Sequence, residues 1–174
     1  FNQVPIHDKS FTQVGLIGEI YVKYNNYGQA YITDWLRSNN MEVVSPPILD
    51  FIMQYFVNSE VKHKKGIEKK TFLPLYNPIL WRYMDKKIEE VNSIAQAYRF
   101  YYPSESIYEK AEYASEILDL ANQFGEGWSV AAEVASFAKR GINRVVCVQP
   151  FGCIANHIVA KGIEKRLKTF YPEM

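Results

Sequence analysis

The sequence of 174 residues predicts an α/β fold, and two observations lead to this prediction. Three short apolar runs, at 14–20, 41–45 and 144–149, read as strands, and the first and third are typical of strands buried on both faces. Helical patterns separate the runs, so the strands should be parallel and joined by right-handed crossovers. With the strand order 2-1-3, the chain would form a flavodoxin-like three-layer sandwich with a short parallel sheet and a helical insert.

The first strand should end near Glu19 to Tyr21. Residues 28–40 then place apolar side chains at helical spacing and finish in a polar stop at 38–40. The second strand, 41–45, should end at Pro46 and Pro47, because neither residue can donate to a strand ladder.

The helical insert should cover 51–124. An aromatic helical pattern over 48–58 leads to a basic stretch at 61–70 and then to a long helix at about 77–101. Ser106 and Glu109 have the spacing of a capping box, so we expect another helix from there to Gly125.

A helix over 129–139, with Gly141 as its C-cap, should precede the third strand. The loop 150–153 then leads into a last helix at about 156–170. The whole of 1–174 reads as one domain, and because it opens on Phe1 and stops where another strand would begin, we expect a fragment of a larger protein.

Composition excludes several classes of protein. Twenty Lys and Arg against 19 Asp and Glu give a net charge of +1, so no global field attracts nucleic acid. No apolar stretch is long enough to span a membrane, and the first residues do not resemble a signal peptide. Two cysteines are too few for a disulfide framework, so we expect a reduced, cytoplasmic setting.

Ligands of flavodoxin-like sheets bind beyond the carboxyl ends of the strands, where the strand order reverses. In the order 2-1-3 this point lies between the first and third strands. Two segments should meet there. They are Glu19, Tyr21 and Asn25 after the first strand, and Gln149 to Cys153 after the third.

Single residues at this edge leave alternatives open. Cys147 lies within a strand and should pack as a small apolar residue, whereas Cys153 follows a glycine in a loop before a helix, where a thiolate is favoured. His157 could share a helix face with Cys153 as a metal ligand, or could simply cap or pack. Glu126, in a Gly-Glu-Gly turn, reads equally as a cleft contact or a solvated turn residue.

Two further features have plainer interpretations. The lysines at 62–70 read as a solvated loop, with contact to an acidic partner or to coenzyme A phosphates as the alternative. The aromatic stripe reads as core, or as surface covered by another part of the protein. It consists of Tyr55, Phe56, Tyr76, Trp81 and Tyr83.

Three segments carry a resemblance to a known family. They are VGLIGEIYVKYN at 14–25, the turn GEGW at 125–128 and VCVQPFGCIANHIVAKGIEKRLKTFYPE at 146–173. Together they resemble the proteins known as 2-hydroxyglutaryl-CoA dehydratase activators or activase-related CoA enzymes, in the region similar to the dehydratase subunits rather than in the ATPase module. The segment QPFGC-x-x-NH is the specific part, and Ala155 departs from the proline that the family pattern has there.

The resemblance implies an iron–sulfur protein in which Cys153 is a cluster ligand. Gln149, Gly152, Asn156 and His157 would shape its loop, together with Pro150 and Phe151. Glu19, Tyr21, Asn25 and Glu126 would line the facing side. The partners it implies are the remainder of the same polypeptide, an ATP-dependent activase module and an acyl-CoA substrate.

The function expected on this basis is low-potential electron transfer from a reduced cluster to an acyl-CoA. Because a cubane cluster takes about four thiolates, the chain alone should be without a cluster and inactive. One alternative is a non-catalytic module that binds coenzyme A or a partner subunit. Another is a small enzyme with a Cys153 nucleophile and a His157 base.

Overall fold

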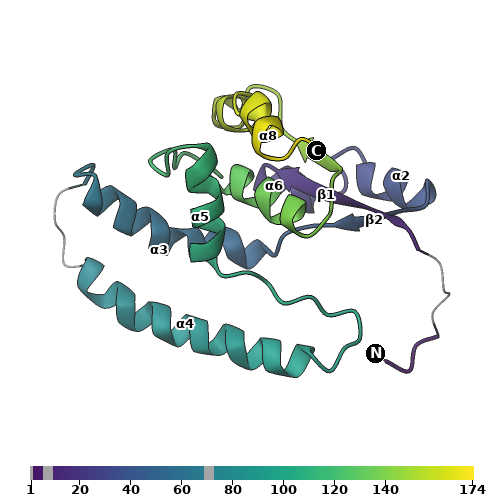
Figure 1. Ribbon diagram of the computed structural model, residues 1–174, viewed down its shortest axis with the longest axis horizontal. Helices are drawn as coiled ribbons and strands as arrows, with labels where there is room; N and C mark the ends of the chain where they lie inside the picture. Colours follow the sequence, from purple (N-terminus) through teal and green to yellow (C-terminus); the bar gives the residue numbers. More distant parts are fainter. Residues whose placement is uncertain (1, 6–9, 69–72) are drawn as a thin grey trace.

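A computed structural model describes residues 2–5, 10–68 and 73–174 of the chain (Figure 1). Its three strands are β1 (Thr12–Gly18), β2 (Met41–Val44) and β3 (Val145–Val148). They form a parallel sheet in the order β2-β1-β3. Gly15 of β1 pairs with Val44 on one side and with Val145 on the other. The predicted α/β class, the parallel sheet and the strand order are therefore confirmed.

The central strand β1 is buried from Val14 to Gly18, which explains its continuous apolar run. Gly15 and Ile17 face helix α6 (Ser129–Lys139), and a Cβ on Gly15 would lie only 2.5 Å from the Phe137 ring. Because side chains alternate along a strand, Val14 and Leu16 point to the other face. Helix α2 (Ile32–Ser38), which packs along β2, belongs to that face by the right-handed crossover rule.

Helix α6 lies at the centre of the core. Its residues from Ser129 to Phe137 are all buried, and Trp128 just before it has no exposed surface. The main hydrophobic cluster surrounds this helix and includes Ile17, Phe56 and Ile117. Helix α6 thus connects the sheet to the helices that precede it in the chain.

Three helices lie between β2 and α6. They are α3 (Ile48–Lys64), α4 (Leu73–Ala95) and α5 (Ile107–Ile117). The predicted capping box is present, with Ser106 and Glu109 each accepting from the other's backbone amide. Helix α4 ends at Ala95 rather than near 101 and contains Pro78, and α5 ends at Ile117 rather than at Gly125. That these helices form an insert remains a prediction.

Two local differences from the expected elements lie at the carboxyl edge of the sheet. A short helix, α1 (Ile20–Tyr24), begins directly after β1, where only the end of a strand was expected. The expected last helix is divided into α7 (Ile154–Asn156), a π turn (His157–Lys161) and α8 (Glu164–Phe170). The amide of Gly162 donates to the carbonyl of His157 at 3.2 Å, which closes the wide turn.

The prediction that Cys147 is buried was wrong. Strand β3 is an edge strand, and its side chains are half-buried except for that of Cys147, which is exposed. An edge strand lacks a neighbour on one side, so an apolar run alone does not ensure burial. Across the described ranges, no helix has both the length and the apolar character needed to cross a membrane.

Candidate functional site

The ends of β1 and β3 approach each other closely at the carboxyl edge of the sheet. The amide of Glu19 donates to the Val148 carbonyl at 3.0 Å. Gly18 has a φ of +119°, and a Cβ there would lie 2.0 Å from the Val148 carbonyl oxygen. Only glycine permits this approach, which brings the segments after both strands together at the predicted point.

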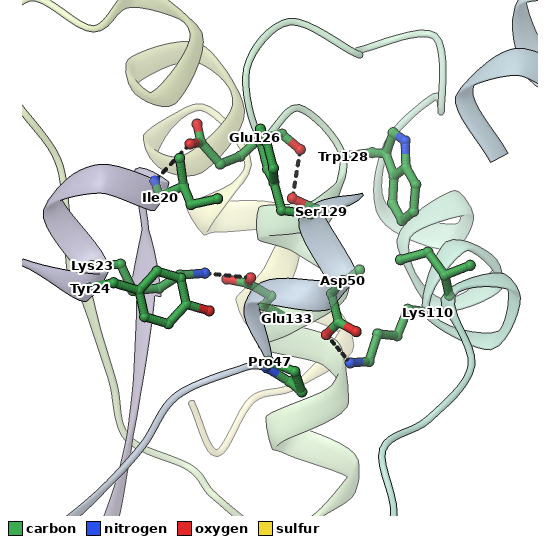
Figure 2. A pocket seen from close by; sticks show the side chains of 13 residues that line it. Ile20, Lys23, Tyr24, Pro47, Asp50, Lys110, Glu126, Trp128, Ser129 and Glu133 are labelled. Atoms are coloured by element: carbon green, nitrogen blue, oxygen red, sulfur yellow. Dashed lines mark hydrogen bonds and ion pairs between the residues drawn. The ribbon is translucent and has the colours of Figure 1, made fainter. Parts of the chain in front are cut away.

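The acidic residues predicted at this edge hold backbone amides. The Glu19 carboxylate caps α1 by accepting from the Val22 amide at 2.8 Å. The buried Glu126 carboxylate accepts from the Ile20 amide, also at 2.8 Å. Figure 2 shows Glu126 reaching from its turn to the start of α1. The alternative of a solvated turn residue is therefore wrong for Glu126.

Tyr21 and Asn25 lie in different environments at this edge, and their role in binding remains a prediction. Tyr21 is exposed, and the Asn25 side chain accepts from the Gly28 amide at 2.9 Å within a local turn. The side of the predicted site formed by the segment after β1 therefore consists mainly of backbone amides held by carboxylates. The loop after β3 forms the other side of this edge.

That loop carries Cys153 at the start of α7. Gly152 before it has a φ of +84°, Phe151 is fully exposed, and Cys153 is half-buried. The Cys153 side chain makes no capping hydrogen bond to the helix. Its carbonyl accepts from the His157 amide at 3.0 Å, which fixes the loop at the beginning of the π turn.

Two residues near Cys153 in the sequence each have a buried polar atom with no hydrogen-bond partner among the described residues. One is Nδ2 of Asn156, a residue that is only 1% exposed, and the other is Oε1 of Gln149. An unpaired buried polar group costs roughly 1–3 kcal/mol, so such groups are rare unless a ligand or water satisfies them. A Cβ on Gly125 would lie 3.8 Å from Ala155 Cβ, so the turn that holds Glu126 adjoins this loop.

A groove of about 670 Å³ lies next to the loop, between β3, α6 and the C-terminal helices. Cys147, Gln149, Phe151 and His157 are among its lining residues. Burial in the groove, opposed by a hydrogen bond from Gln149, raises the pKa of the Cys147 thiol, although part of this side chain is open to solvent. The groove contains His157 but not Cys153, which gives no support to a Cys153–His157 catalytic pair.

Sequence reasoning missed a cluster of buried charges around a small cavity that Ile20 and Glu126 also line (Figure 2). Lys23 Nζ lies 2.7 Å from Glu133 Oε1, and Lys110 Nζ lies 2.5 Å from Asp50 Oδ2. Both lysine side chains are almost fully buried. Both pairs line a cavity of about 10 Å³, which is roughly the size of one water molecule.

Glu133 is the most perturbed carboxyl group of this cluster. Burial raises its pKa to about 7, and the opposing attraction of Lys23 only partly offsets this effect. Its second oxygen, Oε2, has no partner within the described part of the chain. Burial, and after it the carboxylates of Glu133 and Asp50, also raises the pKa of the Tyr24 phenol.

One signal could have pointed to this cluster. Glu133 is the only charged residue among the eight residues from Val130 to Phe137, which are otherwise mainly alanine and valine. A charge within such a run is either on an exposed stripe or paired in the core. Nothing local identifies its partner, because Lys23 is 110 positions away.

The lysine stretch does not form a free basic patch. Lys62 pairs with Glu68, Lys64 with Glu60, and Lys65 with Asp119. Lys69 and Lys70 lie outside the described residues. Lys62 and Lys64 lie in the last turn of α3, so the prediction of a loop was wrong for them. The neighbouring carboxylates balance these charges, which favours a solvated surface over a phosphate site.

The aromatic stripe divides into core and surface. Phe56 is buried, and Trp81 lies edge-on to it and to Tyr108, with ring centroids 5.4 and 4.7 Å away. Tyr55, Tyr76 and Tyr83 are exposed. The core interpretation therefore holds for two of the five residues.

No group of three or more His, Cys, Asp or Glu side chains suited to a metal ion occurs within 2–5, 10–68 and 73–174. No protein-family model, curated protein or solved structure matches the chain.

Proposed function

We propose that the chain is the dehydratase-like α/β domain of an iron–sulfur protein of the 2-hydroxyacyl-CoA dehydratase and activase-related class. In this proposal Cys153 contributes one thiolate to a low-potential cluster. The other ligands come from the rest of the polypeptide or from a partner. An ATP-dependent activase would supply the electron, and an acyl-CoA-type substrate would receive it.

The observation that carries the proposal is that polar side chains in and after the loop that follows β3 lack hydrogen-bond partners among the residues that the structure describes. Cys153 is half-buried at the carboxyl edge of a parallel sheet, and its thiol makes no capping bond. Three residues further along the chain, Asn156 Nδ2 is buried without a partner in the described structure. Such an amide can donate to a cluster sulfur or to a thiolate, and hydrogen bonds of this kind tune cluster potential.

The residues of this chain can supply one thiolate ligand of a cluster, from Cys153, but not a complete ligand set. The sequence contains only two cysteines, and a cubane cluster takes about four thiolates, or three with one open iron. When bound, a cluster supplies one-electron chemistry at low potential. The chain's own contribution is to hold the Cys153 thiol at a fixed place, to partly exclude water and to provide donors around it.

The experiment is anaerobic iron and sulfide analysis, with absorption and EPR spectroscopy, on the intact polypeptide to which the chain belongs. Cys153→Ser should remove the cluster or change its EPR signal. Cys147→Ser is the matched control, because it removes the other thiol from the adjacent groove and should leave the cluster intact. Both variants should be compared with the parent by circular dichroism.

Two results would refute the proposal. One is an intact polypeptide that holds no iron after anaerobic reconstitution. The other is a Cys153→Ser variant that retains the parent's iron content and EPR signal. Asn156→Leu tests the donor separately, because it should shift the reduction potential while iron content is preserved.

A further inference from the structure

The groove beside β3 has the size and the lining of a small-molecule site. Its volume of about 670 Å³ lies within the range of roughly 300–1,000 Å³ that ligand pockets occupy. Gln149 and Pro150 of its lining directly follow β3, so the groove reaches the carboxyl edge of the sheet, where parallel sheets bind ligands. Its aliphatic lining comes from β1, β3, α6, the π turn and α8, and consists of Ile17, Val130, Val134, Val145, Ala160 and Leu167.

The charged side chains that line the groove leave one positive charge in excess. Lys168 forms an ion pair with Glu164 at 2.9 Å. Lys161, at the end of the π turn, lines the same groove but forms no ion pair with any residue that the structure describes. A groove with an apolar lining and one surplus cation complements an amphipathic molecule with a single negative charge. A doubly charged phosphate would find only one counter-charge there.

The charge of Lys161 acts inside the groove, at the thiol of Cys147. Burial raises the pKa of this thiol, and the positive charge of Lys161 is one of the effects that oppose the rise. Next to the thiol, the Gln149 amide donates to Cys147 Sγ at 3.1 Å, while its own Oε1 is buried without a described partner. Rotated by 180°, this amide would accept from the thiol and offer its NH2 group to an anion.

We propose that the groove binds an amphipathic monocarboxylate. The hydrocarbon part of the ligand lies against the aliphatic lining, and its carboxylate lies near Lys161 and Gln149. The inference is independent of the proposed function, because Cys153 does not line the groove.

The first test uses decanoate as the probe and the two cysteines as reporters. The 174-residue chain is alkylated with iodoacetamide at pH 9, and the modified residues are identified by peptide mapping. At ten times its Kd, decanoate should slow alkylation of Cys147 about 10-fold, because about a tenth of the grooves remain free. Cys153, which is outside the groove, should keep its rate.

Two further probes separate the contributions of the charge and of the hydrocarbon chain. Decyltrimethylammonium has the same chain with a positive charge, so it should protect Cys147 at least about 10-fold less well than decanoate. Hexanoate keeps the carboxylate but lacks four methylene groups, and it should also bind at least about 10-fold more weakly. All probes are used below the concentrations at which they form micelles.

A matched pair of lysine variants tests the position of the carboxylate. Lys161→Gln should weaken decanoate binding about 5-fold and leave the binding of the neutral analogue decanol unchanged. Lys165→Gln removes the same charge from an exposed position on α8 outside the groove, and should change neither. Each variant should keep the parent's circular dichroism spectrum and thermal midpoint, which separates loss of binding from loss of the fold.

Four results would overturn the inference. The first is a rate of Cys147 alkylation that decanoate leaves unchanged, and the second is equal protection of Cys147 by decyltrimethylammonium. The third is a Lys165→Gln variant that loses as much affinity for decanoate as Lys161→Gln does. The fourth is protection of Cys147 that increases with protein concentration in the absence of any probe, which would mean that a second copy of the chain fills the groove.

Discussion

The buried pair of Lys23 and Glu133 should make the stability of the protein depend on pH in an unusual direction. An exposed carboxylate beside a lysine ordinarily has a lowered pKa. Glu133 differs because burial outweighs the attraction of Lys23 and raises its pKa from 4.5 to about 7. Replacing Glu133 with glutamine, which mimics the neutral acid, therefore removes a group that the folded state prefers to protonate.

The sign and the magnitude follow from proton linkage. Between pH 4.5 and about 7 the folded protein binds a proton at Glu133 that the unfolded chain has released. The stability that this group contributes is complete below pH 4.5 and is lost as the pH rises through 7. The loss is on the order of 3 kcal/mol, at about 1.4 kcal/mol for each unit of pKa.

The assay is urea denaturation of the parent and of Glu133→Gln at a series of pH values from 4.5 to 8. The difference in unfolding free energy, variant minus parent, should be smallest at pH 4.5. It should rise by about 3 kcal/mol by pH 8, because the variant keeps a neutral group where the parent has to bury a charge. Most other titrating groups contribute equally to the unfolding free energies of the parent and the variant, so their contributions cancel in this difference.

Glu164→Gln serves as a control for an exposed ion pair. A hydrogen bond from Lys168 lowers the pKa of Glu164, so that carboxylate contributes stability above its ordinary pKa and loses it as the pH falls. Because that loss falls below pH 4.5, the control difference should stay nearly constant from pH 4.5 to 8. A Glu133→Gln difference that is independent of pH, or that falls as the pH rises, would refute the reasoning about burial.

Three further predictions concern the scaffold and the free thiol. Gly18→Ala should lower the free energy of unfolding by more than about 3 kcal/mol in thermal unfolding, because its Cβ would collide with the Val148 carbonyl. Gly66→Ala is the control: Gly66 also has a positive φ but lies in open space, so this change should cost only about 1 kcal/mol. Ser106→Ala should cost about 1 kcal/mol in the same assay, and no loss would contradict the capping box. Alkylation of Cys147 by iodoacetamide, followed by peptide mapping, should reach half its maximal rate only above pH 9, and full reactivity at pH 8 would contradict the raised pKa.

The sequence sufficed for the parts of the fold that depend on local pattern. Continuous apolar runs located all three strands, and alternation with helices gave their parallel order. The capping box located the start of α5, and Gly141 the end of α6. Each of these signals lies within a few residues of the structure that it predicts.

The features that sequence reasoning missed depend on distant contacts or on uncommon local chemistry. Helix α1 begins with Glu19 as its N-cap, which is not among the residues that usually signal a helix start. Cys147 is exposed because β3 is at the edge of the sheet, a fact of topology rather than of the apolar run. The Lys23–Glu133 pair joins α1 to α6 across 110 positions.

The residues predicted to bind a ligand at the carboxyl edge of the sheet differ in the hydrogen bonds that they already make. Glu19 was a candidate because it follows β1 at the point where the strand order reverses, and Glu126 because its turn could form a cleft contact. The structure shows each carboxylate accepting from an amide near the start of α1. One oxygen of each carboxylate is thus engaged in holding the start of α1. The loop after β3 is different, since the Cys153 thiol caps no helix and Asn156 Nδ2 lacks a described partner. Cys153 and Asn156 of that loop are therefore the residues to change first in a test for a ligand at this edge.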